Sequence, residues 1–187
     1  QAIALKPDFA EAHSNLGNTL KDLGRLDEAE ASYNQAIALK PDYAQAHYNL
    51  GITLKELGRL EEAEVCYTKA IELKPDYIEA HYNLGNLFKK LGRLEEAESS
   101  YKKAVALSPQ DAEAHNNLGI TLQELGRFEE AETSYKQSIA LKPGDAGAHS
   151  NLGIILQELS RFEDAEASYK QAIALKPDYA EAHSGLG

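Results

Sequence analysis

The chain has 187 residues, of which 43% are hydrophobic and 26% charged, enough for one domain with a core or for a short array of repeats. Its 30 Asp and Glu against 19 Lys and Arg give a formal net charge of −11, which argues against nucleic acids and anionic membrane surfaces as partners. The single cysteine, Cys66, excludes an intramolecular disulfide and a zinc site built on cysteines, and it favours a reducing compartment, with the cytoplasm expected. No apolar run approaches the ~20 residues of a membrane span.

A period of 34 residues organises the whole chain. Proline, histidine and glycine each recur six times at this spacing, and the histidines are His13, His47, His81, His115, His149 and His183. The period predicts five full repeats, 10–43, 44–77, 78–111, 112–145 and 146–179, with partial repeats at 1–9 and 180–187.

Each repeat begins with a predicted helix, which in the first repeat covers residues 10–23. Leu16 and Leu20 lie on one face of that helix together with small residues. Gly24 follows, where the C-terminus of a helix favours a left-handed residue. Ser160 stands where four repeats have this glycine, so we expect a positive φ there at a cost of ~1 kcal/mol.

A second helix is predicted at about residues 27–39, with Tyr33 in its apolar stripe and Pro41 ending it. Asp42 is expected to cap the following helix, with Gln45 three residues later in the capping-box position. The same signal is altered just before the fourth and fifth repeats, where aspartate stands one position later, at Asp111 and Asp145.

A unit of two helices in 34 residues resembles the tetratricopeptide repeat (TPR). The residues of the first repeat that carry the resemblance are Leu16, Gly17, Leu20, Ala29, Tyr33, Ala36 and Pro41, and the pattern covers the whole chain. The resemblance implies an all-α fold, a right-handed superhelical solenoid of antiparallel helix pairs whose inner wall is lined by the first helix of each repeat. One departure is systematic, because His13 and its equivalents stand where the family often has Trp.

One asparagine recurs on the polar face of every complete first helix. Its copies are Asn15, Asn49, Asn83, Asn117 and Asn151, and Gly185 replaces it in the last partial repeat. Asparagine is a mediocre helix former, and its carboxamide offers both donors and an acceptor to a peptide backbone. This asparagine ladder is similar to that of the TPR superhelix of O-linked N-acetylglucosamine transferases, which implies binding of an extended polypeptide in the concave groove. The alternatives are a bond to the neighbouring repeat, or a residue simply copied by repeat duplication.

Other residues of the first helices are expected to assist this site. They are the amides Asn18 and Asn86, the rings Tyr48 and Tyr82, and the basic row Lys21, Lys55 and Lys89. An extended, flexible protein segment with a few basic residues is therefore the predicted ligand. An ordinary solvated helix face is the alternative explanation for these charges.

No catalytic residue, metal site or cofactor is predicted, because each Ser, His and Gly that could serve belongs to the repeat pattern. The histidines recur one repeat apart, on the order of 10 Å for packed helices, too far for shared coordination, so packing between helices is expected. Two other hypotheses remain open. The chain could be the substrate-recruiting arm of a multidomain glycosyltransferase, or a structural scaffold that self-associates head to tail through frayed, uncovered ends.

Overall fold

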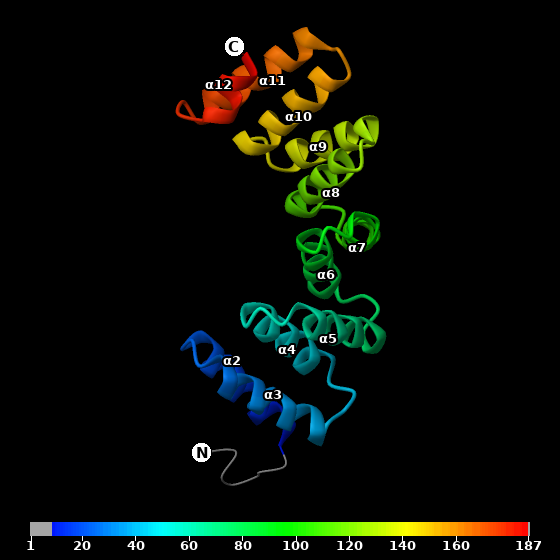
Figure 1. Cartoon of the computed structure of the whole chain (residues 1–187), viewed down its shortest axis with the longest axis vertical. Coiled ribbons are helices and arrows are strands. Elements are labelled where there is room, and N and C mark those ends of the chain that lie inside the picture. Colours follow the sequence, from blue (N-terminus) through cyan, green and yellow to red (C-terminus); the bar gives the residue numbers. More distant parts are fainter. Residues whose placement is uncertain (1–8, 187) are drawn as a thin grey trace. The chain divides into compact units, whose positions relative to one another are not determined.

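The structure is a computed structural model that describes residues 9–186, the side chain of Leu186 excepted. These residues form helices and no strand, as the repeat pattern predicts. The helices are α2 (Ala10–Asp22), α3 (Leu26–Leu39), α4 (Ala44–Glu56), α5 (Leu60–Leu73), α6 (Ile78–Lys90), α7 (Leu94–Leu107), α8 (Ala112–Glu124), α9 (Phe128–Leu141), α10 (Ala146–Glu158), α11 (Phe162–Leu175) and α12 (Ala180–Leu186) (Figure 1). The predicted fraying of the first partial repeat concerns residues 1–8, which lie outside the described residues.

The helices are grouped in two compact units, residues 1–87 and 88–187, with the boundary inside α6. In the first unit, α2 pairs with α3 and α4 with α5, and α3 packs on α4. In the second unit, α8 pairs with α9 and α10 with α11, while α7 packs on α8 and α9 on α10. Each unit is thus a stack of antiparallel helix pairs in which neighbouring repeats bury one another's apolar stripes.

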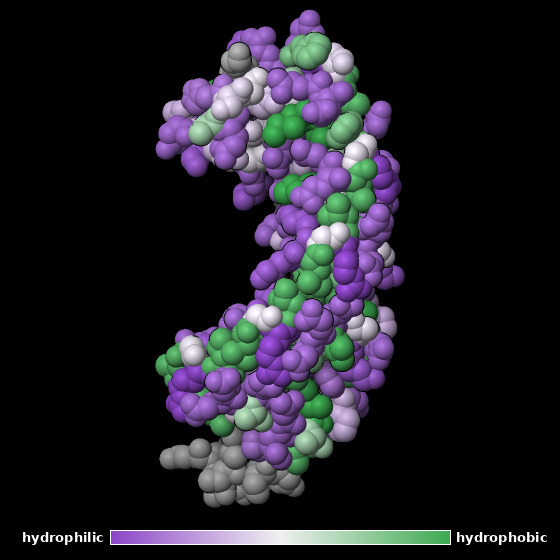
Figure 2. Space-filling view, in the orientation of Figure 1, coloured by the Kyte–Doolittle hydropathy of each residue, from purple (hydrophilic) through white to green (hydrophobic). Residues whose placement is uncertain are grey.

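A tyrosine of the second helix fills the contact inside each pair. Tyr33 is fully buried, and a Cβ added at Gly17 would lie 2.6 Å from its ring. The same contact recurs in the second unit, where a Cβ at Gly153 would lie 2.6 Å from the ring of Tyr169. The glycines at this position therefore allow the two helices of a pair to approach closely. Outside this core, hydrophobic residues reach the visible surface as patches among a hydrophilic majority (Figure 2).

The turn inside each pair also follows the prediction. Gly24 has a φ of 74°, and Ser160 has a φ of 58° at the same repeat position. Ser160 therefore adopts the left-handed conformation that the other repeats assign to glycine.

The predicted cap at Asp42 is wrong, and the reason is register. Helix α4 begins at Ala44 after Tyr43, which makes no side-chain cap, so Asp42 lies one residue too early. Asp111 and Asp145 occupy the capping position itself, and each accepts bonds from two backbone N–H groups of the next turn at 3.0–3.2 Å. The two repeats with the altered signal are thus those with a side-chain cap.

Candidate functional site

The polar faces of the first helices carry the predicted peptide-binding residues, and in the first unit several of these residues bond to one another. The amide of Asn49 on α4 donates to Oδ1 of Asn18 on α2 at 2.9 Å, and its own Oδ1 accepts from Gln45 at 3.0 Å. Asn18 Oδ1 also accepts from the hydroxyl of Tyr33 at 2.8 Å. Asn49 is only 7% exposed, so its carboxamide joins two repeats as the alternative reading of the sequence allows.

Asn83 on α6 makes an equivalent bond to the preceding repeat through a different partner. Its Nδ2 donates to the hydroxyl of Tyr48 at 2.9 Å and to the carbonyl oxygen of Glu79 at 3.0 Å. Lys55 Nζ lies 3.5 Å from its Oδ1. The Tyr48 ring lies with its centroid 4.8 Å from that of Tyr77, which holds the hydroxyl in place. The structure thus brings together predicted residues from three different first helices of the unit.

Asn15 differs from these two asparagines because it is exposed and its side chain makes no hydrogen bond with the described residues. Lys21, further along α2, contacts Asp22 at 3.1 Å, and its side chain is 25% exposed. The three asparagines of this unit therefore share a repeat position but not an environment.

In the second unit, the ladder asparagines Asn117 and Asn151 are half-buried on α8 and α10. The side chain of Asn151 makes no hydrogen bond with the described part of the chain, like that of Asn15. Lys89 is half-buried in this unit, while Asn86 and Tyr82 are half-buried in the first.

The residue at the position of the lysine row, Lys or Gln, decides which side chain accepts a hydrogen bond from the buried tyrosine. In repeats four and five, the hydroxyls of Tyr135 and Tyr169 donate to Gln123 at 2.8 Å and Gln157 at 2.7 Å. In the first repeat, the equivalent position is Lys21, and the tyrosine instead donates to Asn18. An amide therefore satisfies the buried hydroxyl from one of two places, one turn apart on the first helix.

The second repeat has neither amide, since Ile52 and Lys55 occupy the two places. The hydroxyl of Tyr67 is consequently buried without a partner, and the residue is 0% exposed. Burial raises the pKa of Tyr67 above its ordinary value, and nearby Tyr48 adds to the effect. The repeat therefore contains a defect that its neighbours avoid.

The histidines bond to the loops between repeats. In each of five repeats, the histidine Nε2 lies 2.8–3.1 Å from the carbonyl oxygen of the proline six residues earlier. A carbonyl oxygen only accepts, so Nε2 carries the proton and donates. Within the described residues, no group of three or more His, Cys, Asp or Glu is placed to hold a metal ion.

A second link between repeats, which was not predicted from the sequence, is formed by the arginine after each turn. Arg59 donates from Nη1 to Glu30 of the preceding repeat at 2.6 Å and from Nε and Nη2 to Glu62 of its own helix at 2.6 Å. The bond to the preceding repeat is also made by Arg127 to Glu98 at 2.6 Å and by Arg161 to Glu132 at 2.7 Å. The sequence pattern that could have predicted this ion pair is an arginine that follows a glutamate of the preceding repeat by 29 residues.

No helix of residues 9–186 is long and apolar enough to cross a membrane. Cys66 on α5 is half-buried. Burial raises the pKa of its thiol to about 11, and Glu62 and Glu30 add to the effect, so the thiol is protonated at neutral pH. A protonated thiol is a poor nucleophile.

The stacked helix pairs define a helical repeat protein, and comparison with known families gives its class. A TPR repeat model matches residues 17–58 and 53–92, a tetratricopeptide repeat model matches 76–144 and 112–178, and another matches 1–31. The chain belongs to the tetratricopeptide repeat family.

Solved structures of the same fold agree with this assignment. YrrB, described as a TPR protein with an unusual peptide-binding site, is 27% identical with a TM-score of 0.88, over 98% of this chain and 94% of YrrB. A MamA structure is 22% identical with a TM-score of 0.85, over 94% of this chain and 96% of MamA. MamA 41-end from Desulfovibrio magneticus RS-1 is 21% identical with a TM-score of 0.84, over 92% and 98% of the two chains. The MamA likenesses show the fold alone, and a search of curated proteins gave no match.

Proposed function

We propose that this chain is a protein-interaction scaffold that holds an extended polypeptide against the first helices of its repeats through the ladder asparagines. Membership of the TPR family and the likeness to the peptide-binding YrrB support this function. The observation that carries it is that two of the five ladder side chains, Asn15 and Asn151, make no hydrogen bond within the described residues and reach solvent. Polar side chains left unpaired on an otherwise bonded face are those most available to a ligand.

The hydrogen bonds of the first unit determine how many donors and acceptors each ladder asparagine keeps for a ligand. A carboxamide has two N–H donors and two acceptor lone pairs. Asn83 uses both donors, and Lys55 approaches its oxygen only at 3.5 Å, so the oxygen can still accept from a ligand. Asn49 uses one donor and one lone pair and is nearly buried, whereas Asn15 keeps all four positions. Asn15 is therefore the principal contact that we expect in the first unit, and Asn49 is chiefly a link between repeats.

The charge of the chain favours a ligand with some basic residues. The formal net charge is −11, and the lysines of the row are not all available, since Lys21 contacts Asp22 and Lys55 approaches Asn83. An extended, flexible segment with a few Lys or Arg is thus the ligand class that we expect, and a nucleic acid is not. No cofactor takes part in this binding.

The test compares binding of an array of unstructured peptides by the wild type and by an Asn15→Ala/Asn151→Ala variant. Each lost amide removes up to two hydrogen bonds to peptide backbone, so affinities should fall about tenfold or more across unrelated sequences. A Gln35→Ala/Gln137→Ala variant is the matched control, because it removes one exposed amide from a second helix of each unit. Circular dichroism checks that both variants stay folded. Equal binding by wild type and ladder variant, or no binding at all, would refute the proposal.

The structural role of Asn49 is tested separately. An Asn49→Ala change removes its bonds to Asn18 and Gln45 and should lower the free energy of unfolding by about 1–2 kcal/mol. Asn15→Ala should leave it unchanged or slightly higher, since alanine is the better helix former. Urea unfolding of the two variants distinguishes the roles, and equal losses would contradict this division.

A second candidate is the substrate-recruiting arm of a multidomain glycosyltransferase, which the five recurring asparagines favour. The sequence of the full-length gene decides it. A nucleotide-sugar-binding domain downstream of the repeats supports this role, and a gene that encodes TPR repeats only removes it.

A third candidate, head-to-tail self-association, is favoured by apolar side chains at the surface. Leu23 is 65% exposed and Phe162 is 63% exposed. Sedimentation at increasing protein concentration tests it. A mass that rises with concentration and is unchanged in the ladder variant supports assembly, and a constant monomer mass excludes it.

A further inference from the structure

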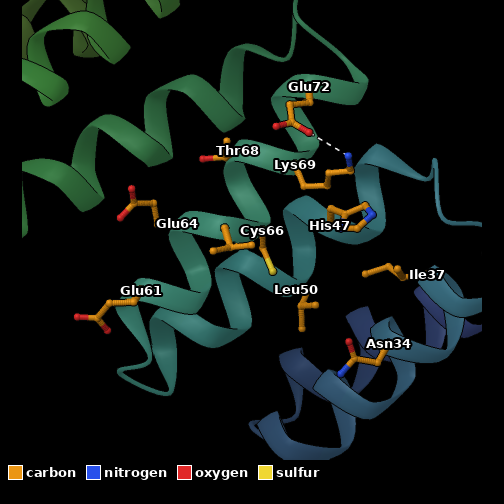
Figure 3. A pocket seen from close by; sticks show the side chains of 11 residues that line it. Asn34, Ile37, His47, Leu50, Glu61, Glu64, Cys66, Thr68, Lys69 and Glu72 are labelled. Carbon is orange, nitrogen blue, oxygen red and sulfur yellow. Dashed lines mark hydrogen bonds and ion pairs between the residues drawn. The ribbon is translucent and has the colours of Figure 1, made fainter.

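A hollow in the first unit lies on a different face from the asparagine ladder. Its volume is about 700 Å³, and its walls are α3 and α5, the second helices of the first two repeats, with α4 between them (Figure 3). Its apolar lining includes Ile37, Leu50, Val65 and Cys66. Val65 is 67% exposed. We call this hollow the α3–α5 groove.

The same place in the second unit gives an internal comparison. There the hollow is lined by Lys136, Ala167 and Ser168, at the repeat positions of Asn34, Val65 and Cys66, and its volume is about 280 Å³. Lys136 pairs with a glutamate one turn earlier at 2.7 Å, which lays its long side chain beside the hollow. The short side chain of Asn34 leaves this space open in the α3–α5 groove.

The charged side chains at the two places differ. The α3–α5 groove is lined by Glu61, Glu64, Glu72 and Lys69, three acidic groups against one basic, and Lys69 is already paired with Glu72 at 2.9 Å. The equivalent hollow of the second unit is lined by two basic groups, Lys136 and Arg161, and one acidic group, Asp164. An apolar floor with an excess of acidic side chains on its rim thus distinguishes the α3–α5 groove from this second hollow, where Lys136 and Arg161 both pair with Glu132.

Cys66 contributes to the apolar floor rather than to its charge. Burial raises the pKa of its thiol to about 11, so the sulfur is uncharged at neutral pH and packs as a small hydrophobic group. Serine occupies this position in each of the other full repeats. The substitution therefore removes a hydroxyl from the wall of the groove.

We propose that the α3–α5 groove is a second docking site, which binds a short segment of a partner protein with one bulky aliphatic or aromatic side chain flanked by Lys or Arg. A volume of about 700 Å³ lies within the range of small-ligand sites and accommodates such a side chain. The flanking cations face the acidic rim, which sets the orientation of the segment and selects against acidic partners. This site is additional to the peptide-binding ladder, because its walls are second helices.

The test uses fluorescein-labelled nonapeptides with a central Leu, Phe or Trp between two lysines on each side. Matched peptides carry Glu in place of Lys, or Ala in place of the central residue. The groove-filling variant is Asn34→Lys/Thr68→Lys, which installs the lysines that later repeats have at this position. Those repeats pair such lysines with a glutamate one turn earlier, as Lys102 does with Glu98, so the variant should fold.

The wild type should bind the Lys-flanked apolar peptides at least tenfold more tightly than either matched set, and added salt should weaken the binding. Measured in the Asn15→Ala/Asn151→Ala background, which weakens binding at the ladder, the groove-filling changes should lower the affinity for these peptides at least tenfold further. Bound peptide should also slow the alkylation of Cys66, the only thiol of the chain, by several fold.

Three results would overturn the proposal: no binding by the wild type, equal affinity for the matched peptides, or equal affinity of the groove-filling variant. Loss of binding in the ladder variant alone would instead place these peptides on the first helices. That outcome would refute the second site and leave the proposed function of the ladder standing.

Discussion

Replacing Lys55 with Gln should stabilise the second repeat, because it supplies the partner that the buried hydroxyl of Tyr67 lacks. Tyr67 is 0% exposed and its hydroxyl makes no hydrogen bond. Glutamine occupies the same position in repeats four and five, where it accepts from the equivalent tyrosines at 2.8 and 2.7 Å. The helix pair of the second repeat has the same architecture, so Gln at position 55 should reach Tyr67 in the same way.

The expected gain follows from the bonds made and lost. One buried hydrogen bond contributes about 1 kcal/mol net, and leaving a buried hydroxyl unpaired costs about 1–3 kcal/mol. The change removes the contact between Lys55 Nζ and Asn83, but at 3.5 Å that contact is longer than an ordinary hydrogen bond. Lys and Gln have similar helix propensities. The free energy of unfolding should therefore rise by about 1 kcal/mol.

Urea unfolding followed by circular dichroism measures this gain. Repeat arrays can unfold in parts, so complete curves are compared between variants rather than single midpoints. Lys55→Met is the matched control, because it removes the charge and keeps the length of the side chain without adding an acceptor. Tyr67→Phe completes a double-mutant cycle, since the gain from Lys55→Gln should disappear when the hydroxyl is absent.

Two results would refute the reasoning. If Lys55→Met stabilises as much as Lys55→Gln, the effect comes from the lost lysine and not from the new acceptor. If the gain persists in the Tyr67→Phe background, the glutamine bonds elsewhere.

Three further predictions concern single positions in the second unit. Ser160→Gly should raise the free energy of unfolding by about 1 kcal/mol in thermal or urea melts, because the φ of 58° suits glycine, and a loss would contradict this. Gly153→Ala should lower it by about 1–3 kcal/mol, since the new Cβ would lie 2.6 Å from the ring of Tyr169, and an unchanged melt would show that the ring can yield. Desolvation raises the pKa of Glu132, but hydrogen bonds from Lys136 and Arg161 outweigh it and hold that pKa below its ordinary value of 4.5. The stabilisation by Glu132 is therefore complete above pH 4.5 and is lost as the pH falls towards the lowered pKa. The free energy of unfolding of Glu132→Gln should consequently fall less steeply with pH in this acid range than that of the wild type. Parallel curves of the free energy of unfolding against pH would argue against this prediction.

Most of the fold could be predicted from the sequence because its signals are local and repeated. The apolar stripes fix the two helices of each repeat, and Gly24 and Ser160 mark the same left-handed turn. The error at Asp42 has a local cause as well. A capping aspartate must stand directly before the first helical residue, and a shift by one position separates Asp111, which caps, from Asp42, which does not.

The environments of the candidate site could not be predicted in the same way, because they depend on contacts between repeats. Asn15 and Asn49 are identical in the sequence pattern, yet one is exposed and the other bonds to Asn18 of the preceding repeat. That bond exists because the first repeat has an asparagine where the second has Ile52. The partner lies 31 residues away, and only the packing of α2 on α4 shows that the two amides meet.

Residues at the same repeat position, such as Asn15 and Asn49, therefore do not share one role. The amide that accepts from the buried tyrosine lies at one of two positions of the first helix. The position that it occupies determines whether a lysine can stand at the other one. Where the amide is Asn18, the neighbouring position is left for Lys21, and where it is Gln123 or Gln157, the basic row ends. The basic row of the first helices is thus linked to the internal hydrogen bonding of each repeat. A change that repairs the tyrosine in the second repeat also removes a charge from the proposed peptide site, so stability and ligand preference are coupled at Lys55.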